Sequence, residues 1–364
     1  MPARMTPSSQ PGQQRPQTDA EGQVAPKEPS SDPTAILRDI RDLIDKGEWK
    51  QGLAKLDAFN QVTPRTIENR PINAMAHLLK ARALLSLGEI AKAWAEGDRA
   101  IALAKEALQP AIEAEAICVL ANIHWKKGKF DQALSVLEKA NEAAARSKDE
   151  RVMGIVNLEK ASVHMKTKDY DVAEREYRQA IVALEKVGEL RQLARAYNNF
   201  AHVFFYQAQW QKAEEMFLKC KRISEKGGFR SIGAWASFNR AEALIELDRL
   251  DEAQKELEWA LPVLEELGDV YGQTVANSVH GVIHARKGDF ARAEAQLEKA
   301  RQLAERLDLP VLKGRLAYEY GLLNKLRGDI QAASILFKEA RDIYMRHGAT
   351  SELVRIEKEL KELH

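Results

Sequence analysis

The segment GKFDQALSVLEKA, residues 128–140, decides the fold of this chain because its pattern returns along almost the whole sequence. It opens on the turn Gly128-Lys129-Phe130, and the same kind of turn recurs every 40 residues without drift. Such a fixed period is the signature of a repeat array rather than of separate globular domains. The other copies of the turn begin at Gly88, Lys168, Ala208, Asp248, Gly288 and Gly328, and an earlier copy at Gly47 lies 41 residues before Gly88.

The positions around each turn keep the same phase. In the quoted segment, Ala133 and Ala140 are seven residues apart with Leu137 between them, and the small residue Ala121 precedes the turn. Spacings of three, four and seven place such side chains on one face of a helix on each side of the turn. Small residues on facing helices also let the two axes approach closely. The chain is therefore predicted to be all-α, with one helix–turn–helix pair in each repeat.

The first residue of each turn is expected to adopt a left-handed conformation that ends the first helix. Glycine adopts this conformation without a steric penalty. Three copies have Lys168, Ala208 or Asp248 in its place. We expect those three turns to be tighter or slightly strained.

The order of small residue, glycine, aromatic residue, alanine, large apolar residue and alanine resembles the tetratricopeptide repeat family, from about Thr34 onward. The family's usual repeat has about 34 residues, so the longer unit here is similar to the sensor domains of Rap-type and MalT-like bacterial regulators. The resemblance implies a right-handed superhelical solenoid of about eight helix–turn–helix repeats over residues 34–364. The first helices would line its concave face, and residues 351–363 would form a C-terminal capping helix.

Composition excludes several classes of function. The net charge is +1, from 55 basic and 54 acidic residues, so binding of nucleic acid through a broad basic surface is not expected. Two isolated cysteines, Cys118 and Cys220, argue against a disulfide scaffold and a thiolate metal site. The sequence lacks an apolar run long enough to span a membrane and the apolar core of a signal peptide. A cytoplasmic protein that does not insert into membranes is expected.

Residues 1–33 differ from the rest in composition. They hold seven of the twelve prolines, are rich in Gln and Ser, and contain few apolar residues. Too little apolar surface is available to offset the entropy of ordering, so this segment is predicted to be a disordered tail. An alternative is that it contains a short motif that docks on a partner or in the protein's own groove.

The sequence contains no recognisable catalytic or cofactor-binding motif. A phosphate-binding loop, an HExxH motif and a nucleophile elbow are all missing. His280 and His284 are four residues apart on a predicted helix, but no third ligand is evident for a metal site. His124, His164 and His284 share one repeat position, which favours packing roles. We expect no enzyme activity, no cofactor and no metal.

The concave stripe of the first helices is the predicted binding site. Asparagine side chains there can donate to and accept from a peptide backbone, and Arg195 could hold a carboxylate through two hydrogen bonds. The alternative is that long helices wind a tight superhelix, in which case this stripe is ordinary core. The predicted groove residues are Asn122, Trp125, Arg195, Asn198, Asn199, His202, Phe205, Trp235, Phe238, Asn239, Glu242, Arg315 and Tyr318, with Trp235, Phe238 and Phe205 as aromatic anchors.

These features indicate a protein that binds another molecule. The leading hypothesis is an adaptor that holds a peptide or helix of a partner protein in its concave groove. The first alternative is a regulatory sensor whose superhelix changes shape when a signalling peptide binds. The second alternative is a scaffold that self-associates. The partner's identity and the oligomeric state stay open.

Overall fold

The computed structural model describes residues 32–64, 66–307, 309–347 and 350–363, and within these ranges it contains seventeen helices and no strand. The all-α solenoid predicted from the repeat is therefore confirmed, with eight pairs and a final single helix. The helices are α1 Pro33–Lys46, α2 Trp49–Val62, α3 Arg70–Ser86, α4 Ile90–Glu106, α5 Pro110–Lys126, α6 Phe130–Ser147, α7 Glu150–Lys166, α8 Tyr170–Val187, α9 Leu190–Tyr206, α10 Trp210–Gly227, α11 Arg230–Glu246, α12 Leu250–Glu266, α13 Val270–Arg286, α14 Phe290–Glu305, α15 Pro310–Arg327, α16 Ile330–Arg346 and α17 Thr350–Glu362.

The recurring turn ends the first helix of each pair through two backbone hydrogen bonds. At Gly128, φ is 72°, in the left-handed region. The Gly128 amide donates to the Trp125 carbonyl at 2.9 Å, and the Lys129 amide donates to the His124 carbonyl at 3.0 Å. This pattern satisfies carbonyls at the helix end that have no partner within the helix. The next helix starts two residues later, so the pair is antiparallel and tightly connected.

The three turns without glycine have the same geometry as the others. Lys168, Ala208 and Asp248 have φ values of 66°, 56° and 59°. At Ala208 the two amide–carbonyl bonds to the end of α9 are also present, at 3.0 and 2.9 Å. The expectation that these turns are tighter is therefore wrong, because the hydrogen bonds fix the backbone whichever residue is there. A side chain in the left-handed region still costs roughly 1 kcal/mol.

Each pair packs on small side chains that are completely buried. Ala133, Leu137 and Ala140 of α6 and Ala121 of α5 all have 0% exposure, as do their counterparts in most other pairs. At the position of the alanine that precedes the turn, α15 has Gly321. A Cβ on Gly321 would lie 2.5 Å from the Phe337 ring of α16. Small side chains thus set the distance between the two helices.

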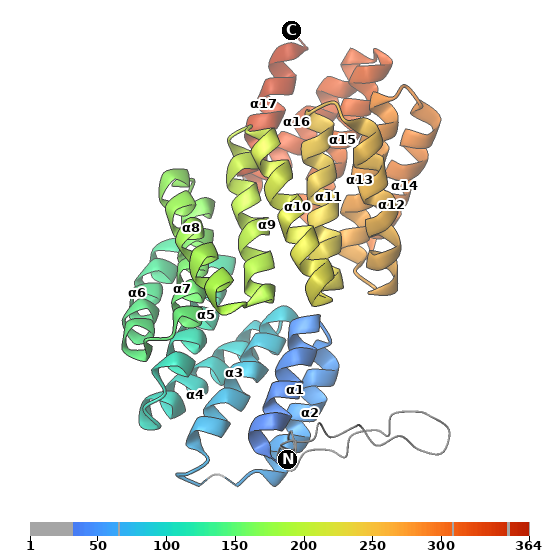
Figure 1. The fold of residues 1–364 in the computed structure, drawn as a ribbon. Coiled ribbons are helices and arrows are strands. Elements are labelled where there is room, and N and C mark those ends of the chain that lie inside the picture. The colour runs from blue at the N-terminus through green and yellow to red at the C-terminus, as the bar shows by residue number, and fades with distance from the viewer. Residues whose placement is uncertain (1–31, 65, 308, 348–349, 364) are drawn as a thin grey trace, which may run out of the picture.

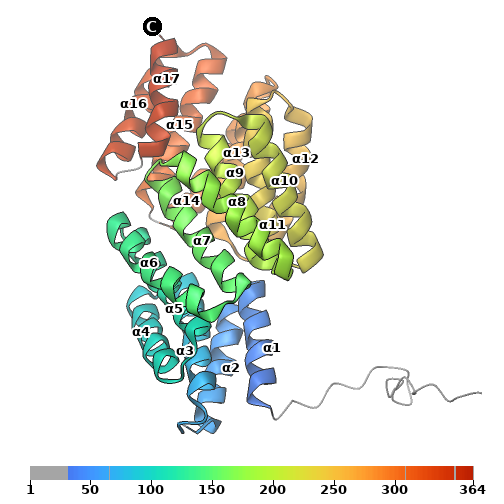
Figure 2. The ribbon, with the colours of Figure 1, turned by 60° about the vertical axis from the view of Figure 1, so that its left-hand side comes forward.

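Odd-numbered helices form the inner layer of the solenoid and even-numbered helices the outer layer. From α1 to α15, each odd helix contacts the next odd helix, whereas even helices are not in comparable contact with one another within the described residues. The array therefore curves toward its odd helices, and Figures 1 and 2 show it winding from α1 to α17. The first helices of the pairs line the inner face, as the resemblance implied.

The superhelix is wound tightly enough for helices four repeats apart to touch. Arg191, at the start of α9, donates from Nε to the Asp45 carbonyl at the end of α1 at 2.7 Å. Likewise Arg355 of α17 lies 5.8 Å from the centre of the Phe205 ring at the end of α9. Arg355 also bonds to Glu246 of α11 at 3.1 Å. Figure 1 shows α1 directly below the lower end of α9.

The final helix covers the last pair. Ile356 and Leu360 of α17 belong to one buried cluster with Phe337 and Tyr344 of α16. Apolar positions of α17 thus shield the end of the core, as predicted for a cap.

The tail predicted for residues 1–33 lies outside the described residues except for its last two. Asp32 accepts a hydrogen bond from the Thr34 amide at 3.0 Å, and Pro33 is the first residue of α1. Aspartate before a first-turn proline is a favourable helix start.

The left-handed turns allow a reciprocal test of backbone strain. Ala208→Gly should stabilise the fold by about 0.5–1 kcal/mol, because glycine removes the left-handed penalty at some cost in chain entropy. Gly128→Ala should destabilise by about 1 kcal/mol. A Cβ at Gly128 would meet nothing within 4 Å, so the effect isolates the backbone. Urea denaturation followed by circular dichroism gives both shifts, and shifts of the same sign would contradict the explanation.

Candidate functional site

Polar side chains from three consecutive inner helices meet at the middle of the inner face. Asn199 of α9 donates to the Ser162 hydroxyl of α7 at 3.2 Å, and Asn198 donates to the Asn199 side-chain oxygen at 3.3 Å. From α11, the Asn239 amide donates to the Asn198 oxygen at 3.1 Å and lies 3.4 Å from His202 Nε2. We call these five residues the amide ladder. Amide groups in such a row can both donate to and accept from a peptide backbone.

His202 is neutral in this ladder. Burial and, secondarily, the Lys166 ammonium lower its pKa to about 4, against an opposing effect of Glu242. A neutral imidazole has one nitrogen that accepts a hydrogen bond, which matches the position of Nε2 beside the Asn239 amide.

A cavity of about 280 Å³ lies on the N-terminal side of the ladder, among α1, α3, α5, α7 and α9. We call it the N-terminal cavity. Asn122 donates to Glu159 Oε2 at 2.6 Å and accepts from the Trp125 indole at 2.7 Å, while Arg195 donates to Glu159 Oε1 at 3.0 Å. Its polar lining consists of Arg82, Ser86, Glu115, Asn122, Trp125, Lys126, Glu159, Arg191, Gln192 and Arg195.

The two carboxylates of the N-terminal cavity are already paired. Glu115 forms ion pairs with Arg151 and with Arg82, the latter at 3.6 Å. Burial opposes its ionisation, but Arg151 and Arg82 outweigh that effect and lower the Glu115 pKa. Glu159 is occupied by Arg195 and an amide, as described above. Both carboxylates thus already have cationic partners within the chain.

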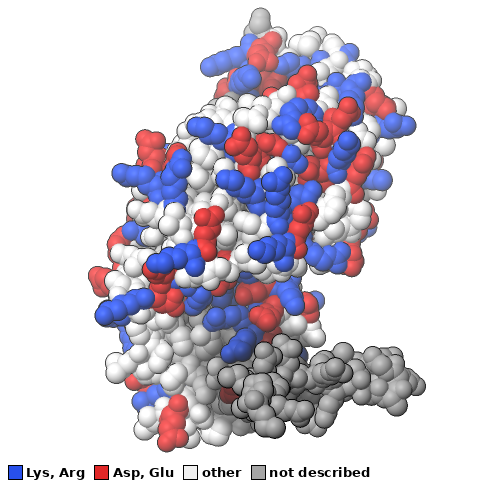
Figure 3. Space-filling view, viewed as in Figure 1, with Lys and Arg blue, Asp and Glu red and all other residues white. Residues whose placement is uncertain are grey.

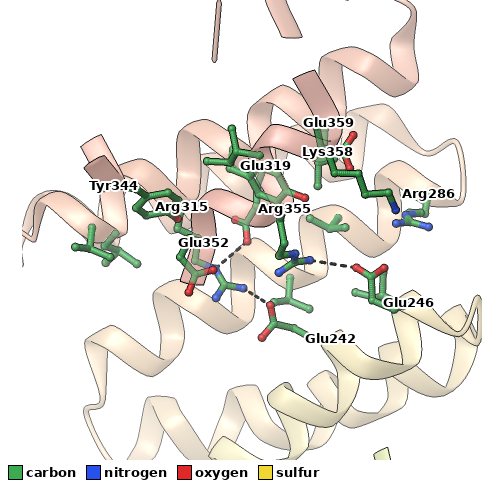
Figure 4. Close-up of a pocket in the computed structure, with 18 of the residues that line it drawn as sticks. Glu242, Glu246, Arg286, Arg315, Glu319, Tyr344, Glu352, Arg355, Lys358 and Glu359 are labelled. Atoms are coloured by element: carbon green, nitrogen blue, oxygen red, sulfur yellow. Dashed lines mark hydrogen bonds and ion pairs between the residues drawn. The ribbon is translucent and has the colours of Figure 1, made fainter. Parts of the chain in front are cut away.

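A second cavity, of about 220 Å³, lies on the other side of the ladder among α11, α13, α15 and α17. We call it the C-terminal cavity. In Figure 4, Arg315 reaches two carboxylates, Glu242 at 2.7 Å and Glu319 at 2.9 Å, and Arg355 reaches Glu246. Burial opposes ionisation of Glu242, but Arg315 and Arg355 outweigh it and lower the Glu242 pKa. A network of partly buried ion pairs therefore lines this cavity.

Sequence models of the tetratricopeptide repeat match residues 40–110, 114–146, 152–226 and 192–266. The chain belongs to the tetratricopeptide repeat family. No curated protein sequence matches it significantly.

Several solved structures share the fold of this tetratricopeptide repeat array at low sequence identity. A Rap protein complexed with Competence and Sporulation Factor is 15% identical, with a TM-score of 0.60 over 92% of this chain and 100% of that one. The apo quorum sensor NprR from B. thuringiensis is 12% identical, with a TM-score of 0.56 over 91% and 98%. The apo form of RapI is 16% identical, with a TM-score of 0.59 over 91% and 97%. The predicted resemblance to Rap-type sensors is thus confirmed for the fold.

The predicted groove residues divide into separate groups along the tetratricopeptide array. Asn198, Asn199, His202 and Asn239 come together in the amide ladder. The remaining predicted residues lie at the N-terminal cavity (Asn122, Trp125, Arg195), at the C-terminal cavity (Glu242, Arg315, Tyr318), or beside the ladder on α9 and α11 (Phe205, Trp235, Phe238).

Most of the predicted aromatic anchors lie inside the packed solenoid. The exposed fractions of the predicted anchors Phe205 and Phe238 are 8% and 2%, and that of Tyr318, another predicted groove residue, is 9%. The tight winding turns these positions into contacts between neighbouring helices, so they act as core in this conformation rather than as exposed anchors. Trp235 is half-buried, donates from its indole to Asp269 at 2.8 Å and stacks on Tyr271.

Sequence reasoning missed several residues of the site. Lys126 directly follows the predicted Trp125, so the repeat phase could have included it. Arg191 and Asp45 are 146 residues apart, and Arg355 lies in the cap. No periodic signal relates residues that meet only because the superhelix completes a turn.

Three further features bear on the range of functions. Within the described residues, no group of three or more His, Cys, Asp and Glu side chains is placed to hold a metal ion. Among those residues, no helix is both long and apolar enough to cross a membrane. Basic and acidic side chains are interspersed over the face shown in Figure 3.

Acidification should destabilise the ladder through His202. The unfolded chain binds a proton on this histidine below a pKa of about 6.5, whereas the folded chain does so only near 4. Stability therefore falls as the pH drops from 7 to 5, by at most about 2 kcal/mol for this group. His202→Gln should reduce the difference between urea midpoints at pH 7 and pH 5. His347→Gln, at an exposed histidine, is the control, and an equal reduction in both variants would contradict the assignment.

Proposed function

We propose that this tetratricopeptide repeat protein binds a peptide segment, either free or within a partner protein, along the inner face of its superhelix. The amide ladder is the observation that carries the proposal. It joins α7, α9 and α11 in one row of groups that both donate and accept, as a peptide backbone does. A ligand contacting several helices of a preformed groove gains orientation from many weak bonds.

The surroundings of the ladder support an elongated ligand. Cavities flank it on both sides, so a chain laid across the ladder can place side chains in each of them. Trp125 on α5 and Trp235 on α11, both inner helices, are half-buried and present aromatic surface. The Rap protein that shares this fold is complexed with Competence and Sporulation Factor. We propose that this chain likewise holds a bound partner.

A regulatory sensor is the second candidate, and the contacts between turns favour it. The contact of Arg191 with Asp45 joins α9 to α1, four repeats away. The contact of Arg355 with Glu246 joins α17 to α11, three repeats away. A ligand that binds one spacing of these turns better than another would shift the pitch of the superhelix. Small-angle scattering with and without a selected peptide separates this candidate from a passive adaptor, since only the sensor changes its radius of gyration.

The proposal is tested by panning a random peptide display library against the wild-type chain and measuring selected peptides by fluorescence anisotropy. The variant Asn198→Ala/Asn239→Ala should weaken their binding ten-fold or more, because each lost hydrogen bond is worth about 1 kcal/mol. The control Gln179→Ala/Gln302→Ala removes two exposed amides from the outer helices α8 and α14 and should leave affinity unchanged. Circular dichroism must show equal helicity for all three.

Failure to enrich any peptide would overturn the proposal. Equal weakening by the inner and outer variants would also overturn it. Sedimentation of the wild type over a range of concentrations tests the self-associating scaffold, because self-association requires the mass of the particle to increase with concentration.

A further inference from the structure

A charged bridge recurs on the outer face of the array, away from the amide ladder and from both inner cavities. Lys80 of α3 reaches Asp57 of α2 at 2.8 Å and Glu96 of α4 at 3.7 Å, so it spans two successive outer helices. In each bridge, a cation of the inner helix occupies the space between two outer helices. Two later pairs have an equivalent bridge, which joins Lys160 to Glu138 and Glu176, and Arg240 to Glu214 and Glu256.

Apolar residues replace this bridge between α4 and α6, which lie at the left of Figure 2. Leu120 of α5 stands at the position of Lys160, and Val136 of α6 at that of Glu176. A cavity of about 910 Å³ lies there, within the range of ligand sites, roughly 300–1,000 Å³. We call it the outer groove, and its apolar lining includes Trp94, Ile101, Leu108, Ile117, Leu120 and Val136.

Leu108, which lines the outer groove, is both strained and exposed. Its φ of 53° is in the left-handed region, and it is 85% exposed. The equivalent positions in three later repeats are Gly188, Gly228 and Gly268, and glycine adopts this conformation without a penalty. A leucine here therefore costs folding free energy and gains little from burial. A strained backbone under an exposed apolar side chain is typical of a contact surface.

The exposed charges in the lining of the outer groove are mainly positive. Lys105 lies on the α4 side, and Lys139 and Arg146 lie on the α6 side, all three exposed. Of the two carboxylates in the lining, Glu113 is buried in the floor, where it pairs with Arg146 at 2.7 Å and with Lys105 at 3.8 Å. The other, Glu142, is exposed.

Further cations lie near the opposite end of the outer groove, where Trp94 meets His124 edge to face with ring centres 5.1 Å apart. Burial, followed by the Lys129 and Lys127 ammonium groups, lowers the His124 pKa. The Asp98 carboxylate there already accepts from the Trp94 indole at 2.9 Å. Positive charge near both ends of the groove favours a ligand with acidic residues.

The shape of the outer groove favours a helical ligand. Its floor is one stripe of α5, from Glu113 through Ile117 and Leu120 to His124, which is about 16 Å long at 1.5 Å per residue. An extended chain on this apolar floor would leave backbone amides and carbonyls without partners, and the described residues contain no strand to pair with it. A helix satisfies its own backbone and can set an apolar stripe between α4 and α6.

We propose that the outer groove binds an amphipathic helix of a partner protein, about three turns long, with its apolar stripe toward Ile117 and Leu120 and acidic residues toward Lys105 and Lys139. Leu108 extends the apolar contact beyond the floor of the groove. This surface is separate from the inner face, so the inference goes beyond the proposed peptide binding and gives the protein a second interface.

The test is a display library of helical peptides of about four turns, with leucines at alternating spacings of three and four residues and random residues elsewhere. The library is panned against the full chain in the presence of excess Leu120→Lys/Val136→Glu, the bridged variant. Asp98 already stands at the position of Glu138, so this variant should form the bridge of the neighbouring repeats and keep its fold. Selected peptides should be rich in Asp and Glu, and anisotropy titrations should show about ten-fold or more weaker binding to the bridged variant.

The variant Leu108→Gly separates binding from stability. Glycine should raise the urea midpoint, because the left-handed strain is relieved. The same change should weaken binding of the selected peptides about ten-fold, because the exposed leucine is lost. The control Ala208→Gly relieves the same kind of strain at a turn of another pair and should leave peptide affinity unchanged.

The charges of the groove are tested separately. Lys105→Gln/Lys139→Gln should weaken the selected peptides about three-fold or more, and added salt should reduce the difference from wild type. The control Lys255→Gln/Lys299→Gln removes two exposed lysines from the outer helices α12 and α14 and should leave affinity unchanged.

Several results would overturn the inference. Failure to select any peptide that distinguishes the wild type from the bridged variant would remove the site, and enrichment of Lys and Arg would contradict its charge. Selected peptides that keep their affinity after a central proline is introduced would contradict the helix. Palmitate that binds more tightly than any selected peptide, with binding lost in the bridged variant, would assign the groove to an acyl chain. A mass that rises with concentration in the wild type and not in the bridged variant would assign it to a second copy of the chain.

The inner-face variant Asn198→Ala/Asn239→Ala separates this inference from the proposed peptide binding. It should bind the selected helices as the wild type does, because its substitutions lie on the inner helices α9 and α11. Loss of helix binding in that variant would place the helices on the inner face and overturn the assignment to the outer groove.

Discussion

Close contact between the two helices of each pair, made possible by buried alanines, is the constraint on which the rest of this structure depends. Ala133 and Ala140 are completely buried, and the same positions stay small in every regular copy. Because each pair has nearly the same geometry and the same 40-residue length, each is rotated on the previous one by a similar amount, and the small rotations add up to a superhelix. The curvature, the inner face and the cavities all follow from that repeated close approach.

The tight winding has a consequence for the charges on the inner face. Once α9 returns over α1, and α17 over α9, side chains that an isolated repeat would leave in water become partly buried, and they persist only when paired. Arg191 of α9 with Asp45 of α1 is an example. Buried pairs of this kind add little net stability but penalise a wrong register strongly. The ion pairs therefore fix how the turns meet.

How far the sequence could predict this structure depends on whether a feature repeats. The helix pairs, the inner position of the first helices and the shared face of Asn198 and Asn239 all follow from the period, because equivalent residues in successive repeats occupy equivalent places. The burial of Phe238 does not follow, since phase tells which face a residue is on but not how tightly the superhelix closes. The contact of Arg191 with Asp45 joins turns of the superhelix, and no local pattern encodes it. The left-handed Ala208 shows that the fold also overrides local preference.

One helix, α9, connects all parts of the candidate site. Its first turn carries Arg191, which contacts α1; its middle carries Asn198 in the ladder; and its last turn carries Phe205 beneath Arg355 of α17. A ligand on the inner face that bonds to the ladder therefore contacts a helix that touches both neighbouring turns. Binding need not change the shape of the array, because a ligand shifts an equilibrium only by its differential affinity for the two forms. If the spacing of α1, α9 and α17 has more than one stable value, ligand contacts at α9 are coupled to that spacing. Peptide binding and the response of a sensor would then both follow from the position of α9 between α1 and α17.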